Sequence, residues 1–156
     1  MGFKNSEGWG IIRRDEFGPL IRYDGTLNAE RYIELLDRCL VPAYPRQIEM
    51  SELTHVYDGA SPHKAVLTKE YYEDNLPSHL KLPPQSPDLN LIENCWSYLR
   101  DKLYEKNTIL KTKDDVLKEA NVIWFGMMQN LLPKLYNSMH SRLQAVIDKE
   151  GKSINY

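Results

Sequence analysis

Hydrophobic and polar positions change their spacing along the chain, from short extended segments to helical repeats. Two hydrophobic segments flank the turn-like sequence 15–19 and predict a β-hairpin over residues 9–23. From Asn28, the expected N-cap, the spacing becomes that of an amphipathic helix. The hydrophobic positions of this helix are Tyr32, Leu35, Leu36, Cys39 and Leu40.

The middle of the chain predicts two short strands separated by a helix. A β-rich segment at 53–57 ends at Asp58, which stands in a turn-like sequence. The pair Ser61–Pro62 is typical of an N-cap followed by proline in the first turn, and predicts a helix towards Asn75. A second short strand is expected at 79–82.

The remainder of the chain predicts three helices. The first begins at 86–88, and its hydrophobic positions are Leu89, Ile92, Trp96, Leu99 and Leu103. The second is expected around 114–125 and the third around 130–149. The third has hydrophobic positions at Leu131, Leu135, Met139, Leu143 and Val146. The element order β-β-α-β-α-β-α-α-α predicts the α/β class.

Composition narrows the class of protein but not its activity. The chain has 156 residues, of which 42% are hydrophobic and 27% charged, as expected of a folded domain. The net charge of -2 gives no strong basic field of the kind that attracts nucleic acid. No signal peptide and no membrane-spanning stretch is recognised, so a nuclear or intracellular location is expected, without a membrane partner.

Two acidic residues occupy positions that suit metal chemistry. Asp58 follows a predicted strand, so its side chain is expected at the rim of a sheet. Glu93 lies beside the hydrophobic stripe of a predicted helix, where an acid must be paired, bound to metal or at the edge of a cleft. Together the two carboxylates could hold hard divalent cations such as Mg²⁺. A turn aspartate and a boundary glutamate that reaches water are the alternative interpretation.

Two segments of the chain resemble motifs of the Tc/mariner-type DDE transposases. The motif that carries the family's second aspartate resembles Tyr57-Asp58-Gly59-Ala60-Ser61-Pro62-His63-Lys64-Ala65. The motif that carries its third carboxylate resembles Leu82-Pro83-Pro84-Gln85-Ser86-Pro87-Asp88-Leu89-Asn90-Leu91-Ile92-Glu93-Asn94-Cys95-Trp96. Between Asp58 and Glu93 lie 93 − 58 − 1 = 34 residues, the spacing expected in the Tc branch.

The resemblance implies a fold and a division of the chain. The expected fold is ribonuclease H-like (the DDE/integrase fold), without its first central strand and with extra C-terminal helices. Residues 1–156 would form a single partial catalytic domain. Its parts would be the hairpin at 9–23, the remainder of the catalytic core at 28–93, and C-terminal helices at 94–156.

The resemblance also implies an activity, which is metal-dependent cleavage of DNA phosphodiester bonds followed by strand transfer. Asp58 and Glu93 would be the catalytic residues and the ligands of Mg²⁺ or Mn²⁺. The family's first aspartate would lie before Trp9, where this sequence has no Asp, so we expect metal binding to be weak or absent and the chain to be inactive. Gly59 also stands where the family usually has Asn. The alternative is a non-catalytic module that binds nucleic acid or interacts with a transposase.

The resemblance suggests DNA, in the form of transposon ends, as the partner. A second copy of the chain or a full-length transposase is the other expected partner. Candidate DNA-binding residues are His63, Lys64, Arg100 and Lys102. Solvated helix faces are the more common role of such basic residues, and a hydrogen bond at a helix start is the more common role of such a histidine.

Overall fold

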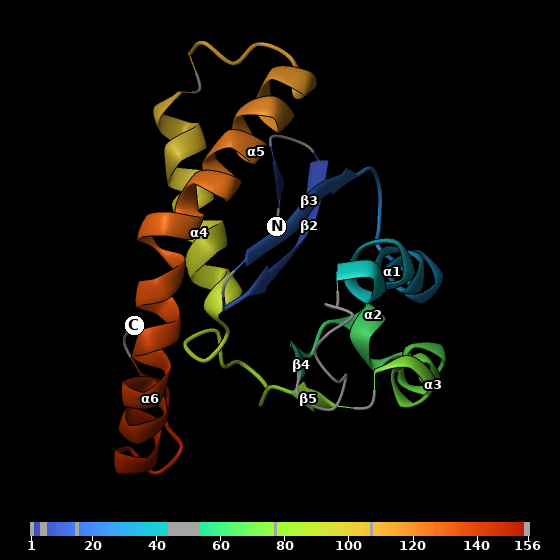
Figure 1. Ribbon diagram of the computed structural model, residues 1–156, viewed down its shortest axis with the longest axis vertical. Coiled ribbons are helices and arrows are strands. Elements are labelled where there is room, and N and C mark those ends of the chain that lie inside the picture. The colour runs from blue at the N-terminus through green and yellow to red at the C-terminus, as the bar shows by residue number, and fades with distance from the viewer. Residues whose placement is uncertain are drawn as a thin grey trace. The chain divides into compact units, whose positions relative to one another are not determined.

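The computed structural model gives two compact units, each of which is described by itself (Figure 1). Unit 1 comprises Met1–Gly25 and Pro87–Tyr156, and unit 2 comprises Thr26–Ser86. The structure describes residues 2–3, 6–14, 16–43, 54–76, 78–106 and 108–154. Each unit contains strands and helices, which confirms the mixed α/β class.

The sheet of unit 1 is built on the predicted hairpin. Strands β2 (Ser6–Arg13) and β3 (Glu16–Tyr23) pair in antiparallel fashion. A short strand β1 (Gly2–Phe3) pairs antiparallel with the start of β2, so the strand order is β1-β2-β3. The sequence did not indicate β1, because two residues are too few to show a hydrophobic alternation.

The turn of the hairpin is shorter than the sequence predicts. Gly18 and Pro19 were assigned to the turn, but both lie within β3. The register of the two strands shifts between Gly10 and Ile12, where a β-bulge accommodates an extra residue of β3. A Cβ atom at Gly18 would lie 2.9 Å from the Cβ atom of Ile11. The close approach of the two strands therefore requires glycine at this position.

Three helices complete unit 1, as predicted. They are α4 (Leu91–Glu105), α5 (Lys113–Asn130) and α6 (Leu132–Asp148). Helix α5 contacts α4, α6 and strand β3, and Figure 1 shows α5 crossing α4 and leading into α6. A capping box fixes the start of α5, because the side chains of Thr112 and Asp115 each accept a hydrogen bond from the other's backbone N–H.

The core of unit 1 lies between these helices and the hairpin. Its fully enclosed side chains include Cys95, Trp124 and Leu99. The predicted stripe of α4 is confirmed at Leu99, which is buried, while Ile92, Trp96 and Leu103 are partly buried and pack against the core, and Leu91 and Cys95 are the other buried residues of the helix. The helix begins at Leu91 rather than at 86–88, and its i, i+4 positions from that start form the buried row.

The predicted stripe of α6 is partly wrong. Leu135 is buried as expected, but Leu143 is 47% exposed. The buried position in this turn is Arg142, which is 3% exposed. The hydrophobic spacing alone cannot identify this residue, because its burial depends on hydrogen bonds from another part of unit 1.

Unit 2 begins with the predicted helix. Asn28 is its N-cap and accepts a hydrogen bond from the Arg31 backbone N–H at 3.0 Å. Helix α1 (Ala29–Leu35) continues as a π-helical segment (Leu36–Leu40) and a 3₁₀ turn (Val41–Ala43). The predicted hydrophobic positions are buried except Cys39, which is half-buried. Helix α1 therefore presents the expected face to the rest of unit 2.

A parallel pair of strands forms the sheet of unit 2. Strands β4 (His55–Tyr57) and β5 (His79–Lys81) lie in register from His55↔His79 to Tyr57↔Lys81. The two predicted strands are thus confirmed, although Leu53 lies outside the described residues. Parallel strands require a crossover connection, which is supplied here by the helical segment between them.

The helix between these strands is broken in two. Helix α2 (Ser61–Lys64) is followed by α3 (Val66–Asn75), and the backbone of Ala65 between them is extended, with φ −59° and ψ 145°. The sequence predicted one continuous helix with Ser61 as its N-cap, but the N-cap is Ala60. The Thr68 hydroxyl donates a hydrogen bond to the Pro62 carbonyl at 2.7 Å, which ties the two helices together.

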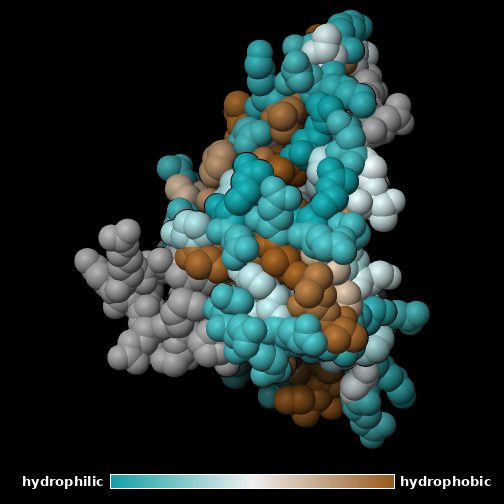
Figure 2. Space-filling model, turned by 90° about the vertical axis from the view of Figure 1, so that its right-hand side faces the viewer, coloured by the Kyte–Doolittle hydropathy of each residue, from teal (hydrophilic) through white to brown (hydrophobic). Residues whose placement is uncertain are grey.

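Hydrophobic side chains also reach the surface of both units. Figure 2 shows one face of the molecule, on which hydrophobic patches interrupt the hydrophilic side chains. Such a mixture is ordinary for globular proteins, whose surfaces always retain much apolar area. None of the described helices has the length and hydrophobicity required to cross a membrane.

Candidate active site

Asp58 follows strand β4 directly and is held by two near neighbours in unit 2. Its Oδ1 atom accepts a hydrogen bond from the Ala60 backbone N–H at 2.9 Å. The Nδ1 atom of His63 lies 2.7 Å from the same oxygen. The side chain of Asp58 is 44% exposed, whereas that of His63 is 17% exposed. The carboxylate is therefore fixed by its neighbours on one side and accessible on the other.

The contacts of Asp58 favour its charged form. His63 beside the carboxyl group lowers the pKa of Asp58 below its ordinary value, and the hydrogen bond from the Ala60 N–H acts in the same direction. Burial opposes this effect but does not outweigh it. The His63 ring N–H is not aligned for a regular hydrogen bond to Oδ1, so the pair is best described as a close electrostatic contact.

An aromatic cluster lies beneath Asp58 and His63. The rings of Tyr32 and His63 are 4.3 Å apart between centroids. The Tyr32 hydroxyl lies 3.0 Å from the Tyr72 hydroxyl and 3.4 Å from Nε2 of His55. Tyr32 and Tyr72 are buried. Rings packed at these distances give Asp58 a support with little freedom to rearrange.

This cluster is uncharged at neutral pH. Burial lowers the pKa of His55 to about 4, and the neighbouring His63 and His79 act in the same direction. Burial also raises the pKa of Tyr32 and of Tyr72. Asp58 therefore stands as a negative charge above a neutral, polarisable group of rings.

Glu93 occupies the first turn of helix α4 in unit 1. Its side chain is half-buried, and its backbone N–H donates to the Asn90 carbonyl at 3.0 Å. An acidic side chain in the first turn interacts favourably with the helix dipole. The fully buried residues Leu91 and Cys95 lie two positions before and after Glu93 and therefore point to the other side of the helix, whereas the partly buried Trp96, three positions later, is on the side of Glu93.

A pair of stacked indoles fixes the helix of Glu93 against the hairpin. The rings of Trp96 and Trp124 are 4.8 Å apart between centroids. The indole N–H of Trp124 donates to the Gly18 carbonyl at 3.0 Å. A Cβ atom at Gly10 would lie 2.8 Å from the Trp124 ring, so the strand approaches this ring as closely as a glycine permits. The indoles thereby join α4, α5 and the hairpin.

The four candidate DNA-binding residues differ in their surroundings. His63 contacts Asp58, and Lys64 is exposed at the end of α2. Arg100 is exposed and donates to the Ser97 hydroxyl at 2.7 Å. The Lys102 ammonium lies 2.9 Å from both oxygens of Glu105, which takes up part of the positive charge available to DNA.

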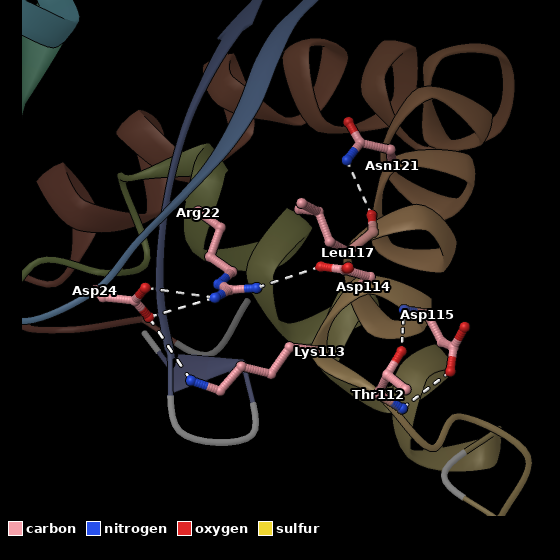
Figure 3. A network of polar contacts seen from close by, with 8 residues as sticks. All are labelled: Arg22, Asp24, Thr112, Lys113, Asp114, Asp115, Leu117 and Asn121. Carbon is pink, nitrogen blue, oxygen red and sulfur yellow. Dashed lines mark hydrogen bonds and ion pairs between the residues drawn. The ribbon is translucent and has the colours of Figure 1, made fainter.

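Basic residues at the start of α5 are also paired. Figure 3 shows the Arg22 guanidinium between Asp24 and Asp114, with Lys113 directed at Asp24 as well. The N···O distances are 3.4 Å for Arg22–Asp24, 4.0 Å for Arg22–Asp114 and 3.8 Å for Lys113–Asp24. Acidic partners therefore offset the positive charge of this corner of unit 1.

The convergence of the two candidate ligands stays a prediction. Asp58 belongs to unit 2 and Glu93 to unit 1, and each unit is described separately. Within the described residues, no group of three or more His, Cys, Asp or Glu side chains is arranged to hold a metal ion. The two carboxylates themselves fit a hard cation, because oxygen ligands of this kind suit Mg²⁺ and Mn²⁺.

Two features around these acids leave little signal in the sequence. The first is the cluster of Tyr32, His55 and Tyr72. Its signals are the place of Tyr32 on the hydrophobic face of a predicted helix and the two aromatic rings of the predicted strand that contains His55. The second is buried Arg142, whose signal is a lone basic residue on the core face of a helix. Both are recognisable only after the elements are placed.

The chain is similar to known DNA-mobilising proteins over most of its length. Residues 9–116 match the family described as DDE superfamily endonuclease. The Tc3 transposase of Caenorhabditis elegans is 28% identical over 148 residues, which are 95% of this chain and 45% of that protein. The Tcb1 transposase of Caenorhabditis briggsae is 26% identical and the Tc1 transposase of Caenorhabditis elegans 25% identical, each over 95% of this chain and 53% of the relative. The chain thus spans about half the length of these relatives.

Proposed function

Because this chain belongs to the DDE superfamily endonuclease family, we propose that Asp58 and Glu93 are two of the catalytic carboxylates of a transposase. The observation that carries this proposal is that the family match at 9–116 contains both acids. Asp58 stands at the end of a strand and Glu93 in the first turn of a helix. The proposed reaction is cleavage of DNA phosphodiester bonds followed by strand transfer.

In this proposal, Asp58 and Glu93 hold the divalent cations of the site. When bound, Mg²⁺ or Mn²⁺ would activate the attacking water or 3′-hydroxyl and stabilise the leaving oxygen. Asp58 contributes a carboxylate whose lowered pKa keeps it charged, while the adjacent His63 fixes one of its oxygens. Glu93 contributes a second carboxylate from a helix start that is packed against the hairpin.

We propose a ribonuclease H-like fold as the arrangement that brings these acids together. The supporting observations are the antiparallel hairpin and the parallel pair β4–β5 with its helical crossover. In such a fold, the end of β4 and the start of α4 would lie on one edge of a common sheet. The division of the 156 residues into hairpin, core remainder and C-terminal helices is part of the same proposal.

DNA at transposon ends is the proposed substrate, with a second copy of the chain or a full-length transposase as the proposed protein partner. A nuclear location follows if the substrate is chromosomal. Lys64 is better placed for contacts with phosphate than Lys102 or Arg100, because Glu105 contacts the Lys102 ammonium and Asp101 lies 3.9 Å from the Arg100 guanidinium.

We further propose that these 156 residues are inactive on their own. The sequence before Trp9 contains no Asp, so a site built from Asp58 and Glu93 has fewer anionic oxygens than the family's set of three carboxylates. Fewer charged ligands weaken cation binding and leave the bridging position between two metals unfilled.

Plasmid nicking tests this proposal. The purified protein with Mg²⁺ or Mn²⁺ is expected to leave a supercoiled plasmid intact. A fusion that adds a family-type strand with an Asp before Met1 is expected to nick the plasmid, and Asp58→Asn or Glu93→Gln should abolish that nicking. Nicking by the fusion that survives both substitutions would reject the assignment of the two acids.

The same assay addresses the non-catalytic alternative. Nicking by the unextended protein that disappears in Asp58→Asn would overturn the proposed inactivity. A fusion that never nicks DNA, yet binds it with the same affinity in the wild-type and Asp58→Asn forms, would favour a non-catalytic module.

A further inference from the structure

Buried Arg142 links helix α6 to the segment that precedes Glu93. Its Nη1 atom donates to the backbone carbonyl of Asp88 at 2.6 Å and to Oδ1 of Asn94 at 3.1 Å. Its Nε atom donates to the Ser138 hydroxyl at 2.9 Å. The guanidinium of Arg142 therefore joins helix α6 to the turn before α4 and to the first turn of α4.

Asp88 ties the same segment to the end of the described chain. Its Oδ2 atom accepts a hydrogen bond from the Ile154 backbone N–H at 2.8 Å, and Oδ1 accepts one from the Leu89 backbone N–H at 3.2 Å. Asp88 is 8% exposed and Ile154 is 7% exposed. The carboxylate thus fixes the residues after α6 onto the turn before α4, rather than capping α4 itself.

These contacts hold the residues on either side of Glu93. Asn94, its immediate neighbour, is held by Arg142, and the turn five residues before it is held through Asp88. On the opposite side, Trp96 stacks on Trp124. A shift of this segment would break several buried or partly buried hydrogen bonds at once, and unpaired buried polar groups destabilise a fold.

Part of this framework lies beyond the region that the family match covers. The match ends at residue 116, whereas Ser138, Arg142 and Ile154 follow it. Helix α6 therefore contributes to the structure around Glu93, because its residue Arg142 holds the start of α4.

We propose that Arg142 and Asp88 are positioning residues that set the orientation of the Glu93 carboxylate for metal binding. This inference rests on the proposed function for the role of Glu93 as a ligand. Neither residue would itself be a metal ligand. Arg142 acts through Asn94 and the Asp88 carbonyl, and Asp88 acts through the backbone of the turn.

Mn²⁺ titrations of the full 156-residue protein, followed by the electron paramagnetic resonance signal of free Mn²⁺, test the inference. Arg142→Lys keeps the charge but loses the fork, and it is expected to weaken Mn²⁺ binding roughly 10- to 100-fold, the range typical of groups that orient metal ligands. Combined with Glu93→Gln, the same substitution should cause no further loss. Lys134→Met, an exposed change on the same helix, is the control and should leave the affinity unchanged.

A milder pair of variants keeps the test valid if Arg142→Lys fails to fold. Ile154→Pro removes the N–H that binds Asp88, whereas Ile154→Ala keeps the N–H and removes apolar contacts. Only Ile154→Pro should weaken Mn²⁺ binding, although both variants should lower the melting temperature. Equal Mn²⁺ affinities in these two variants and in wild type would overturn the inference.

The outcome for Glu93→Gln separates the inference from the function on which it rests. If Glu93→Gln weakens Mn²⁺ binding and neither Arg142→Lys nor Ile154→Pro does, Arg142 and Asp88 have only a structural role. If Glu93→Gln leaves Mn²⁺ binding unchanged, the proposed role of Glu93 itself is wrong.

Discussion

At the scale of single residues, the chemistry of Asp58 depends on neighbours that the sequence only partly reveals. The nearby His63 could be predicted as a polar contact because it follows five positions later, after a turn. The rings of Tyr32 and Tyr72 could not, because they come from helices on either side of β4 in the chain. Residue type and spacing therefore identify the acid, whereas the packed structure determines its charge and support.

His55 should make the stability of unit 2 dependent on pH. Its pKa is about 4 in the folded protein, below the ordinary value of 6.5. Between these two values the unfolded chain binds a proton that the folded chain does not, so the free energy of unfolding falls as the pH decreases from 6.5 to 4. The loss attributable to His55 is on the order of 3 kcal/mol and is absent above pH 6.5.

Urea denaturation at pH 7 and at pH 4.5 checks this expectation. His55→Gln should lose less stability than the wild type between the two values, whereas His140→Gln, in an exposed position of α6, should behave as the wild type does. An equal loss in the wild type and His55→Gln would show that His55 does not titrate as described.

At the scale of elements, the sequence located helices and strands well and their faces less well. The hairpin, the two parallel strands and the three C-terminal helices occur where the hydrophobic spacing places them. In α4 the predicted Leu99 is buried, but the predicted Ile92 and Trp96 are only partly buried and Leu91 and Cys95 are buried instead. In α6 Arg142 is buried where the sequence predicts that Leu143 is. A hydrophobic pattern cannot predict this, because the burial of Arg142 depends on hydrogen bonds to groups distant in the chain.

Gly10 of the hairpin should tolerate substitution poorly. Gly10→Ala would place a Cβ atom 2.8 Å from the rigid Trp124 ring, so it is expected to destabilise the protein by about 1–3 kcal/mol. Gly59→Ala is the matched control, because a Cβ atom there meets nothing within 4 Å. The control should be neutral or stabilising by up to about 1 kcal/mol. Melting temperatures that fall equally in both variants would contradict the packing described for Trp124.

At the scale of the whole molecule, the motifs identified the family, while the arrangement of the two units lies beyond what hydrophobic spacing can predict. Asp58 and Glu93 come from different units, and the 34 residues between them include helices α2 and α3 and strand β5. Spacing in the chain does not determine spacing in the fold, because the path between the two acids depends on long-range contacts. Their shared site is therefore the central claim to test.

A double-mutant cycle on Mn²⁺ binding tests that claim most directly. The dissociation constant would be measured for the wild type, Asp58→Asn, Glu93→Gln and the double variant. If the two carboxylates share a site, each single substitution weakens binding, and the two effects are coupled by roughly 0.5–3 kcal/mol rather than additive. Effects that simply add, or a double variant that binds Mn²⁺ as the wild type does, would contradict a common metal site.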